Sequence, residues 1–266
     1  MNNQPESSPL SPALMTYKTI GSVDLQLHVF MPPGHNAPDL RAAIVFFFGG
    51  GWTGGTPAQF YPQCGYLAGR GMVAISAEYR IRSLHHTSPA ECVKDGKSAV
   101  RWIRQHAAEL GIDPQKVAAG GGSAGGHVAA AAGNAKGFEE PGEDLSCSSR
   151  PDALVLFNPV LDNGPGTFGH DRLQDYWEQI SPLHNIDRNA PPAIIFLGTE
   201  DDVIPVEQAE RYKALMEQSG VRCDLHLYEG QKHGFFNKDR YAETLAETDR
   251  FLHSLGYIPT PRLEGV

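Results

Sequence analysis

Ser123 is the residue whose surroundings in the sequence point most directly to chemistry. It stands at the centre of Gly121-Gly122-Ser123-Ala124-Gly125, a G-x-S-x-G pattern. The residues before it predict a short buried strand over 117–121, and the small residues after it predict a helix over 125–132. A serine between a strand and a helix sits in a strained turn that lifts its hydroxyl above the sheet, at a helix N-terminus that favours negative charge. Ser123 is therefore a candidate nucleophile, although a glycine-rich turn with an incidental serine would give the same pattern.

A serine nucleophile needs two partners from elsewhere in the chain. A neutral imidazole must accept the hydroxyl proton, and an acceptor must hold the other ring nitrogen. His233 stands out because it lies on a loop between the last predicted strand and the final helix. His127, one helical turn after Ser123, is explained more simply by packing and hydrogen bonding beneath the turn. The loop after the predicted strand 193–197 offers three adjacent carboxylates, Glu200, Asp201 and Asp202, which spacing alone does not rank.

Three glycines, residues 49–51, directly follow a buried apolar run and precede Trp52. Acyl transfer needs hydrogen-bond donors aimed at an oxyanion, and backbone N–H groups can serve only where no side chain blocks the approach. We interpret these glycines as a candidate oxyanion loop. A merely flexible loop fits the pattern equally well.

The elements that must position these residues follow from the apolar pattern. Two segments near the N-terminus predict an antiparallel hairpin, and the later continuous apolar runs predict strands buried on both faces of a parallel sheet. The predicted strands cover residues 16–20, 23–29, 42–48, 72–77, 117–121, 153–157, 193–197 and 221–227, and the predicted helices cover 89–110, 125–132, 206–219 and 237–255. This alternation predicts an α/β fold, a single doubly wound domain with a mostly parallel eight-stranded sheet and an antiparallel N-terminal edge.

Two segments fall outside this alternation. Residues 1–14 predict a flexible arm. Residues 161–188 lack periodicity and carry Phe168, Tyr176 and Trp177. A connection of this length inside a domain is usually functional, so we interpret it as a small cap or lid, with a surface excursion as the equal alternative.

Composition narrows the class of partner. The chain has 266 residues, 41% of them hydrophobic, and a net charge of −9, which argues against nucleic acid or an anionic membrane surface as partner. No apolar run reaches the length of a membrane span. The polar first residues favour a cytoplasmic location, or a secreted protein whose signal is absent from this form. The four cysteines, Cys64, Cys92, Cys147 and Cys223, lack metal-ligand spacing and predict free thiols and no metal site.

Several motifs together carry a resemblance that runs from about residue 16 to 255. They are Gly-Gly-Gly-Trp at 49–52, Glu78-Tyr79-Arg80, Asp95 with Trp102, Gly-Ile-Asp-Pro at 111–114, Gly-Gly-Ser-Ala-Gly-Gly-His at 121–127, Ile-Ser-Pro-Leu-His at 180–184, Gly-Thr-Glu-Asp at 198–201 with Pro205, and His233-Gly234-Phe235. The sequence resembles the α/β-hydrolase superfamily, in particular its hormone-sensitive-lipase-like and bacterial acetyl- or feruloyl-esterase group of carboxylesterases.

Carried over position by position, the resemblance implies roles for the candidate residues. Ser123 becomes the nucleophile, His233 the base and Asp201 the orienting acid, in the chain order that this fold uses. The implied oxyanion donors are the backbone N–H groups of Gly50, Gly51 and Ala124. No metal or organic cofactor is implied.

One position departs from the family pattern. Where the family usually has a histidine before the three glycines, this chain has Phe48. That histidine is thought to help hold the oxyanion loop through hydrogen bonds, which a phenyl ring cannot form. We therefore expect activity to persist but the rigidity of the loop, and with it the rate, to depend on other contacts.

The resemblance implies a serine carboxylester hydrolase that acts on a small-molecule ester through an acyl-enzyme. A minimal cap with bulky side chains predicts a shallow acyl pocket that favours short acids such as acetate. The side chains expected to contact the substrate are Trp52, Phe168, Tyr176, Trp177 and Phe235. An acetylated or feruloylated plant carbohydrate is a further substrate class that the resemblance implies.

Two other functions compete with this one. A prolyl-oligopeptidase-like peptidase shares the serine turn but usually carries a large additional domain, which does not fit into 266 residues. A non-catalytic binding protein on this fold, such as a hormone receptor, typically lacks one of the three reactive residues, and all three positions are filled here. The last predicted strand and helix offer an edge at which a homodimer could form.

Overall fold

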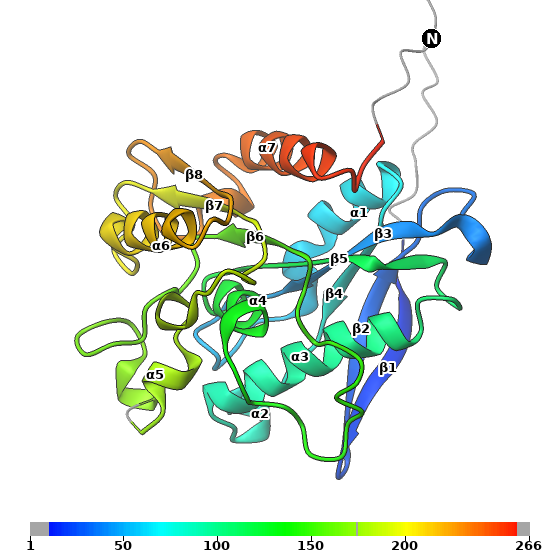
Figure 1. Ribbon diagram of the computed structural model, residues 1–266, viewed down its shortest axis with the longest axis horizontal. Helices are drawn as coiled ribbons and strands as arrows, with labels where there is room; N and C mark the ends of the chain where they lie inside the picture. Colours follow the sequence, from blue (N-terminus) through cyan, green and yellow to red (C-terminus); the bar gives the residue numbers. More distant parts are fainter. Residues whose placement is uncertain (1–10, 174, 260–266) are drawn as a thin grey trace, which may run out of the picture.

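Eight strands form one sheet at the centre of the computed structural model, which describes residues 11–173 and 175–259 (Figure 1). Their order across the sheet is β1 (Ala13–Ile20), β2 (Val23–Phe30), β4 (Val73–Ala77), β3 (Arg41–Phe47), β5 (Ile112–Gly122), β6 (Ala153–Phe157), β7 (Ala193–Gly198) and β8 (Cys223–Tyr228). The β1–β2 and β2–β4 pairs are antiparallel, and all later pairs are parallel. The predicted α/β fold, with eight strands and an antiparallel N-terminal edge, is confirmed.

Helices cover both faces of the sheet (Figure 1). On one face lie α1 (Tyr61–Gly69) and α7 (Tyr241–Ser254), and on the other lie α3 (Pro89–Gln105), α4 (Ala124–Asn134) and α6 (Val206–Gln218). The remaining helical turns are short: α2 (Arg82–His85), α5 (Trp177–Ile180) and the 3-10 turns Ala37–Asp39, Pro57–Phe60, His170–Arg172, Pro182–Asn185 and Phe235–Asn237.

Strand β3 shows why consecutive apolar residues are needed at the centre of such a sheet. Ile44 and Phe46 pack into the core beneath α1 and α7, whereas Ala43, Val45 and Phe47 pack into the core on the opposite face. Side chains alternate between faces along a strand, and both faces are covered, so every position must be apolar.

The predicted element boundaries differ from the structure in two instructive places. Helix α3 begins at Pro89 as predicted, because Ser88 and Glu91 form a reciprocal capping box, but it ends at Gln105 rather than at residue 110. Residues 106–110 continue as turns up to Gly111, whose φ of +61° no regular helix adopts. Helix α1 was not predicted, since Pro62 and Gly65 interrupt its apolar pattern.

The two ends of the described chain bear on other expectations. Residues 1–10 of the arm expected over residues 1–14 lie outside the described residues. Strand β1 begins at Ala13, three residues before the start of the predicted strand. All four cysteines are free thiols, as predicted. Within the described ranges, no helix is long and apolar enough to cross a membrane.

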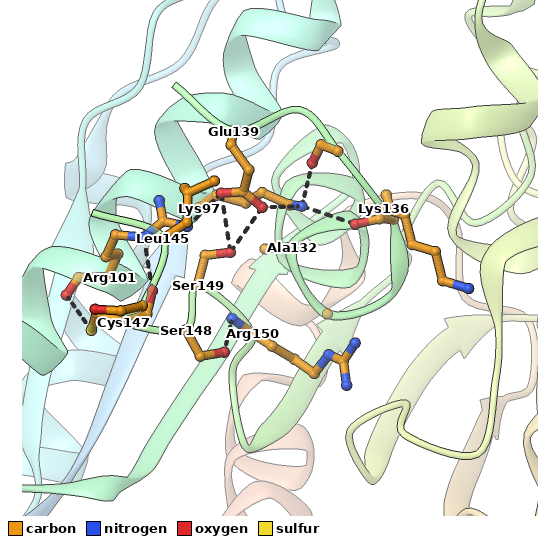
Figure 2. Close-up of a pocket in the computed structure, with 14 residues that line it drawn as sticks. Lys97, Arg101, Ala132, Lys136, Glu139, Leu145, Cys147, Ser148, Ser149 and Arg150 are labelled. Atoms are coloured by element: carbon orange, nitrogen blue, oxygen red, sulfur yellow. Dashed lines mark hydrogen bonds and ion pairs between the residues drawn. The ribbon is translucent and has the colours of Figure 1, made fainter. Parts of the chain in front are cut away.

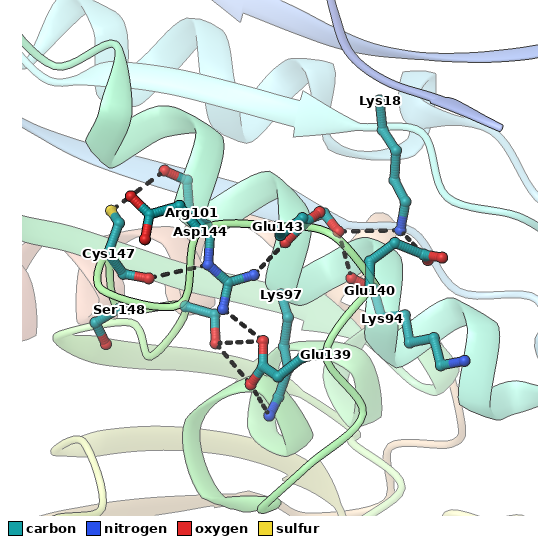
Figure 3. Close-up of polar contacts among 12 residues, drawn as sticks. Lys18, Lys94, Lys97, Arg101, Glu139, Glu140, Glu143, Asp144, Cys147 and Ser148 are labelled. Atoms are coloured by element: carbon teal, nitrogen blue, oxygen red, sulfur yellow. Dashed lines mark hydrogen bonds and ion pairs between the residues drawn. The ribbon is translucent and has the colours of Figure 1, made fainter.

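Residues 135–152, which connect α4 to β6, are held against α3 by ion pairs. Figures 2 and 3 show Lys97 and Arg101 converging on Glu139 beside a surface cavity of about 360 Å³. Lys97 Nζ lies 2.9 Å from Glu139 Oε1 and also donates to the Ala135 carbonyl, while Arg101 Nη2 lies 2.5 Å from Glu139 Oε2. Burial alone would raise the pKa of Glu139, but the hydrogen bonds from Arg101 and Lys97 outweigh it and lower that pKa.

A second buried cluster ties the same connection to the N-terminal edge (Figure 3). Lys18 of β1 lies 2.7 Å from Asp95 and 2.6 Å from Glu140, and Arg80 pairs with the same two carboxylates. Asp95 is fully buried and pairs with both cations, so removing Lys18 and Arg80 together would leave its charge without compensation. Both clusters therefore hold residues 135–152 against the rest of the fold.

Candidate active site

The serine turn has the strained geometry that the sequence predicts. Ser123 follows β5 and precedes α4 with φ +54° and ψ −118°, a conformation that non-glycine residues rarely adopt. Its N–H donates to the Phe157 carbonyl at 2.9 Å, and its carbonyl accepts from the N–H groups of His127 and Val160. These bonds to α4 and to the segment after β6 hold the strained residue in place.

The flanking glycines are required because backbone segments meet here. A Cβ on Gly125 would lie 2.0 Å from the Phe47 carbonyl oxygen, and one on Gly121 would lie 2.5 Å from the Gly125 carbonyl. These distances are shorter than any real contact, so α4 could not sit this close to β3 with a side chain at either position.

The structure brings Ser123, His233 and Asp201 together at the carboxyl ends of the parallel strands. Ser123 Oγ lies 3.0 Å from His233 Nε2, and His233 Nδ1 lies 2.8 Å from Asp201 Oδ2. The Asp201 side chain is buried, and its Oδ1 also accepts from the N–H groups of Val203 and Ile204 at 2.9 Å each.

The geometry distinguishes Asp201 from its two acidic neighbours. Glu200 and Asp202 are exposed, whereas Asp201 turns inward toward the imidazole. A carboxylate in this position accepts a hydrogen bond from Nδ1–H and leaves the Nε2 lone pair facing the serine hydroxyl. The arrangement can therefore take a proton from Ser123.

The glycine loop, residues 49–51, lies next to Ser123, and hydrogen bonds to its carbonyl groups fix its conformation. Gly50 has φ +130° and Gly51 has φ +59°. The Gly50 carbonyl accepts from the N–H groups of Thr53 and Gly54, both at 3.0 Å. Because a trans peptide places N–H opposite C=O, these bonds fix the direction of the Gly51 N–H. The N–H groups of Gly50 and Gly51 form no hydrogen bond within the described residues.

A cavity of about 600 Å³ opens in front of these groups. It is lined by the glycine loop and by Ser123, Asn158, Phe168, Val203, His233 and Phe236, among others. Free donors, a candidate nucleophile and a base thus face one space, as acyl transfer through a tetrahedral intermediate requires. Among the described residues, no group of three His, Cys, Asp or Glu side chains could hold a metal ion.

Comparison with known proteins agrees with this geometry. Residues 44–237 match the model of a family described as alpha/beta hydrolase fold. The chain belongs to this family.

Two solved esterase structures superpose on this α/β hydrolase over nearly the whole chain. An esterase of the planctomycete Thermogutta terrifontis, Est2 with propionate bound, superposes with a TM-score of 0.90 at 46% identity, over 94% of this chain and 96% of that one. The same organism's esterase 2 phosphorylated by paraoxon superposes with a TM-score of 0.90 at 45% identity, over 97% of this chain and 100% of that one.

Curated relatives of the α/β hydrolase are also esterases. Esterase LipC of Mycobacterium tuberculosis is 32% identical over 72% of this chain, which spans 52% of that protein. Carboxylesterase NlhH of the same species is 28% identical over 82% of this chain and 73% of its own length. The chain spans about half the length of the first curated relatives that it matches. The resemblance to carboxylesterases drawn from the sequence is confirmed.

Of the five aromatic residues expected to contact substrate, one lines the cavity. Phe168 lines the cavity, but Trp52, Tyr176, Trp177 and Phe235 do not. Trp52 is 1% exposed and lies between His127 and Phe168. Tyr176 and Trp177 pack against a buried cluster that joins Leu173 and Ile180 of the 161–188 segment to Val93 of α3 and Ala131 of α4. The Tyr176 hydroxyl donates to Ser88 Oγ at the start of α3.

Phe236 lines the cavity in place of the expected Phe235, and the reason lies in the backbone. Gly234 has φ +83° and starts the 3-10 turn Phe235–Asn237. This turn sends the Phe235 ring against Tyr228 of β8 and leaves its neighbour Phe236 on the cavity wall. Residue bulk alone could not have distinguished the two.

Other contacts, which the sequence did not reveal, compensate for the absence of a histidine at position 48. Its ring stacks on Tyr79 at 4.3 Å, and the Tyr79 hydroxyl donates to the Phe48 carbonyl at 2.7 Å. The next residue, Gly49, donates its N–H to Gln59 Oε1 at 2.7 Å, and Gln59 Nε2 donates to Asn237 Oδ1 at 3.2 Å. Hydrogen bonds from Gln59 and Tyr79 thus hold the loop that a histidine usually helps to hold.

The 161–188 segment reaches the glycine loop from the other side. Arg172 Nη1 donates to the Gly51 carbonyl at 2.5 Å, and its guanidinium lies over the Phe168 ring. His127, beneath the serine turn, is fully buried and hydrogen-bonded through Nε2 to Asn163 at 3.0 Å. These contacts match the packing interpretation of His127 and join the segment to the loop.

Proposed function

We propose that the protein is a serine carboxylesterase that cleaves short-chain, acetyl-type esters through Ser123, His233 and Asp201. The observation that supports this most is the continuous hydrogen-bonded series from Asp201 through His233 to Ser123 Oγ at the wall of an open cavity. Neighbouring backbone donors and esterase relatives add to it.

The chemistry proceeds in two halves. Ser123 Oγ attacks the ester carbonyl while its proton passes to His233 Nε2, and the resulting oxyanion accepts hydrogen bonds from the N–H groups of Gly50, Gly51 and Ala124. The imidazolium, stabilised by Asp201, returns the proton to the departing alcohol, and an acyl-enzyme remains. Water then attacks the acyl-enzyme by the same route and releases the acid.

Short acyl groups are favoured by the cover over the cavity. We propose that residues 161–188 are a small cap of the one hydrolase domain, and that Phe168 of this cap, together with Phe236, limits the acyl side of the cavity. Structures of the Thermogutta esterase are described with propionate and with butyrate bound, which fits short acids in that relative. The likeness supports the same acyl range here.

Hydrolysis of p-nitrophenyl acetate, butyrate and octanoate by the wild type and by Ser123→Ala tests the proposal. The expected result is faster cleavage of acetate and butyrate than of octanoate, and a loss of several orders of magnitude with Ser123→Ala. Faster cleavage of octanoate would overturn the short-acyl assignment. Absence of hydrolysis in the wild type, or full activity in Ser123→Ala, would overturn the serine mechanism.

A further inference from the structure

Asn158 occupies a position that the sequence analysis did not single out. It follows β6, the strand next to β5, and is 1% exposed. Its φ is +35°, and its N–H donates to the Phe196 carbonyl at 2.7 Å. Asparagine and glycine tolerate positive φ better than other residues, so the backbone alone would accept either.

The side chain of Asn158 makes contacts that glycine could not make. Its Oδ1 accepts a hydrogen bond from the Gly234 N–H at 3.1 Å, immediately after His233 in the chain. Because a backbone N–H can only donate, the oxygen of the amide must face Gly234, and the Nδ2 group must face the other way. Nδ2 lies 3.4 Å from His233 Nε2, the nitrogen that also contacts Ser123 Oγ.

One end of the Asn158 amide therefore contacts the His233 imidazole, and the other contacts the backbone of the next residue. The oxygen holds the backbone beside His233, and the NH₂ group lies at the ring nitrogen that must stay unprotonated to accept the serine proton. An N–H donor beside Nε2 is compatible with the neutral ring whose proton faces Asp201, and it opposes a ring flip that would turn Nε2 away.

We propose that Asn158 is a positioning residue that keeps His233 Nε2 aimed at Ser123 Oγ in its unprotonated form. The inference rests on the proposed esterase function, because it assigns Asn158 a task only if His233 acts as the base. It distinguishes a role for the Asn158 side chain in turnover from a purely structural role at the end of β6.

Two variants of Asn158 and one matched control test the inference with p-nitrophenyl acetate as substrate. Asn158→Gly keeps the positive φ without strain but removes both side-chain contacts. Asn158→Asp keeps an acceptor for the Gly234 N–H and replaces the donor at Nε2 by a carboxylate. Asn134→Ala is the control, since Asn134 is also buried and donates to Tyr212 and Pro182 away from the cavity.

We expect Asn158→Gly to lower kcat about 10- to 100-fold with KM changed less than about threefold, the loss expected when two neutral hydrogen bonds are removed together. Asn158→Asp should also lower kcat, and it should move the acid limb of the kcat/KM profile to higher pH, because the carboxylate favours the protonated imidazole. Asn134→Ala should lower the melting temperature and leave both kcat and the pH profile as in the wild type.

The possible results separate this inference from the function on which it rests. If the wild type cleaves the ester, Ser123→Ala does not, and both Asn158 variants keep kcat within about threefold with an unchanged pH profile, the inference is wrong and the proposed function stands. If Asn134→Ala loses kcat as strongly as Asn158→Gly, the effect is structural and the inference is also wrong. Absence of activity in the wild type overturns both.

Discussion

His127 gives a prediction about stability that follows directly from its surroundings. Burial lowers the pKa of its imidazole from the ordinary 6.5 to about 4, partly offset by the hydrogen bond to Asn163. The ring is fully buried, with its centroid 5.1 Å from that of Trp52. We replace it by glutamine, whose terminal NH₂ group can still donate to Asn163 but does not titrate.

The sign and size of the effect follow from proton linkage. Between pH 6.5 and 4 the unfolded chain binds a proton on His127 that the folded chain does not, so the free energy of unfolding falls as the pH falls. The difference of about 2.5 pH units corresponds to about 3 kcal/mol in total, of which about 2 kcal/mol is lost between pH 7.5 and pH 5.

Urea unfolding at pH 7.5 and pH 5 measures this loss. The wild type should lose about 2 kcal/mol more of its free energy of unfolding than His127→Gln does over this interval. His86→Asn is the control, because His86 is exposed with φ +54°, a conformation that asparagine also adopts. This control should retain the wild-type pH dependence.

Equal pH dependence in the wild type and in His127→Gln would refute the reasoning, because it would mean that the buried ring accepts a proton as easily as the unfolded chain does. A flattened curve in His86→Asn would refute it as well, since the pH dependence would then not belong to the buried position.

Three further predictions concern the loops that surround the site. Gln59→Met keeps the side-chain length but removes the hydrogen bond to the Gly49 N–H, and it should lower kcat about tenfold, which is less than the loss of an oxyanion donor costs. The control Gln63→Met, in α1, should leave kcat unchanged. Equal kcat values in the two variants would exclude a role of Gln59 in holding the oxyanion loop. Asp201→Asn should lower kcat about 10³- to 10⁴-fold in the p-nitrophenyl acetate assay, and a loss below tenfold would argue against its orienting role. Folding lowers the pKa of Glu139 below its ordinary value of 4.5, so its carboxylate stabilises the fold above pH 4.5 and this contribution is lost as the pH falls through the folded pKa. Between pH 5 and pH 3.5 the melting temperature of Glu139→Gln should therefore fall less than that of the wild type. An equal fall in both proteins would contradict this.

The fold was predictable because its signals are continuous in the chain. Short apolar runs rich in β-branched and aromatic residues favour strands covered on both faces, and capped amphipathic patterns such as Ser88 to Gln105 favour helices between them. The glycines around Ser123 and at 49–51 mark close backbone approaches. Such signals require no knowledge of tertiary packing.

The cavity wall was less predictable, because it depends on which way individual side chains turn. Trp52 has the bulk expected of a pocket residue, yet its φ of +57° accompanies a ring that is buried between His127 and Phe168. Phe236, not Phe235, faces the cavity because of one glycine turn. Bulk is visible in a sequence, whereas direction is set by tertiary contacts.

Gln59 and Asn158 were missed for different reasons. Gln59 belongs to no motif, and only its contacts with Gly49 and Asn237 give it significance. Asn158 had a signal that could have been used, since it directly follows a central strand, as do Ser123 after β5 and the loop of Asp201 after β7. Ligand sites in parallel sheets gather at such carboxyl ends.

The most direct test of the central claim is covalent labelling with a fluorophosphonate probe, followed by intact-mass measurement and peptide mapping. Such a probe reacts with a serine only where a base activates the hydroxyl. We predict one adduct per chain on Ser123, none in Ser123→Ala, and strongly slowed labelling in a variant lacking His233. Absence of labelling in the folded wild type, or an adduct on another serine, would contradict it.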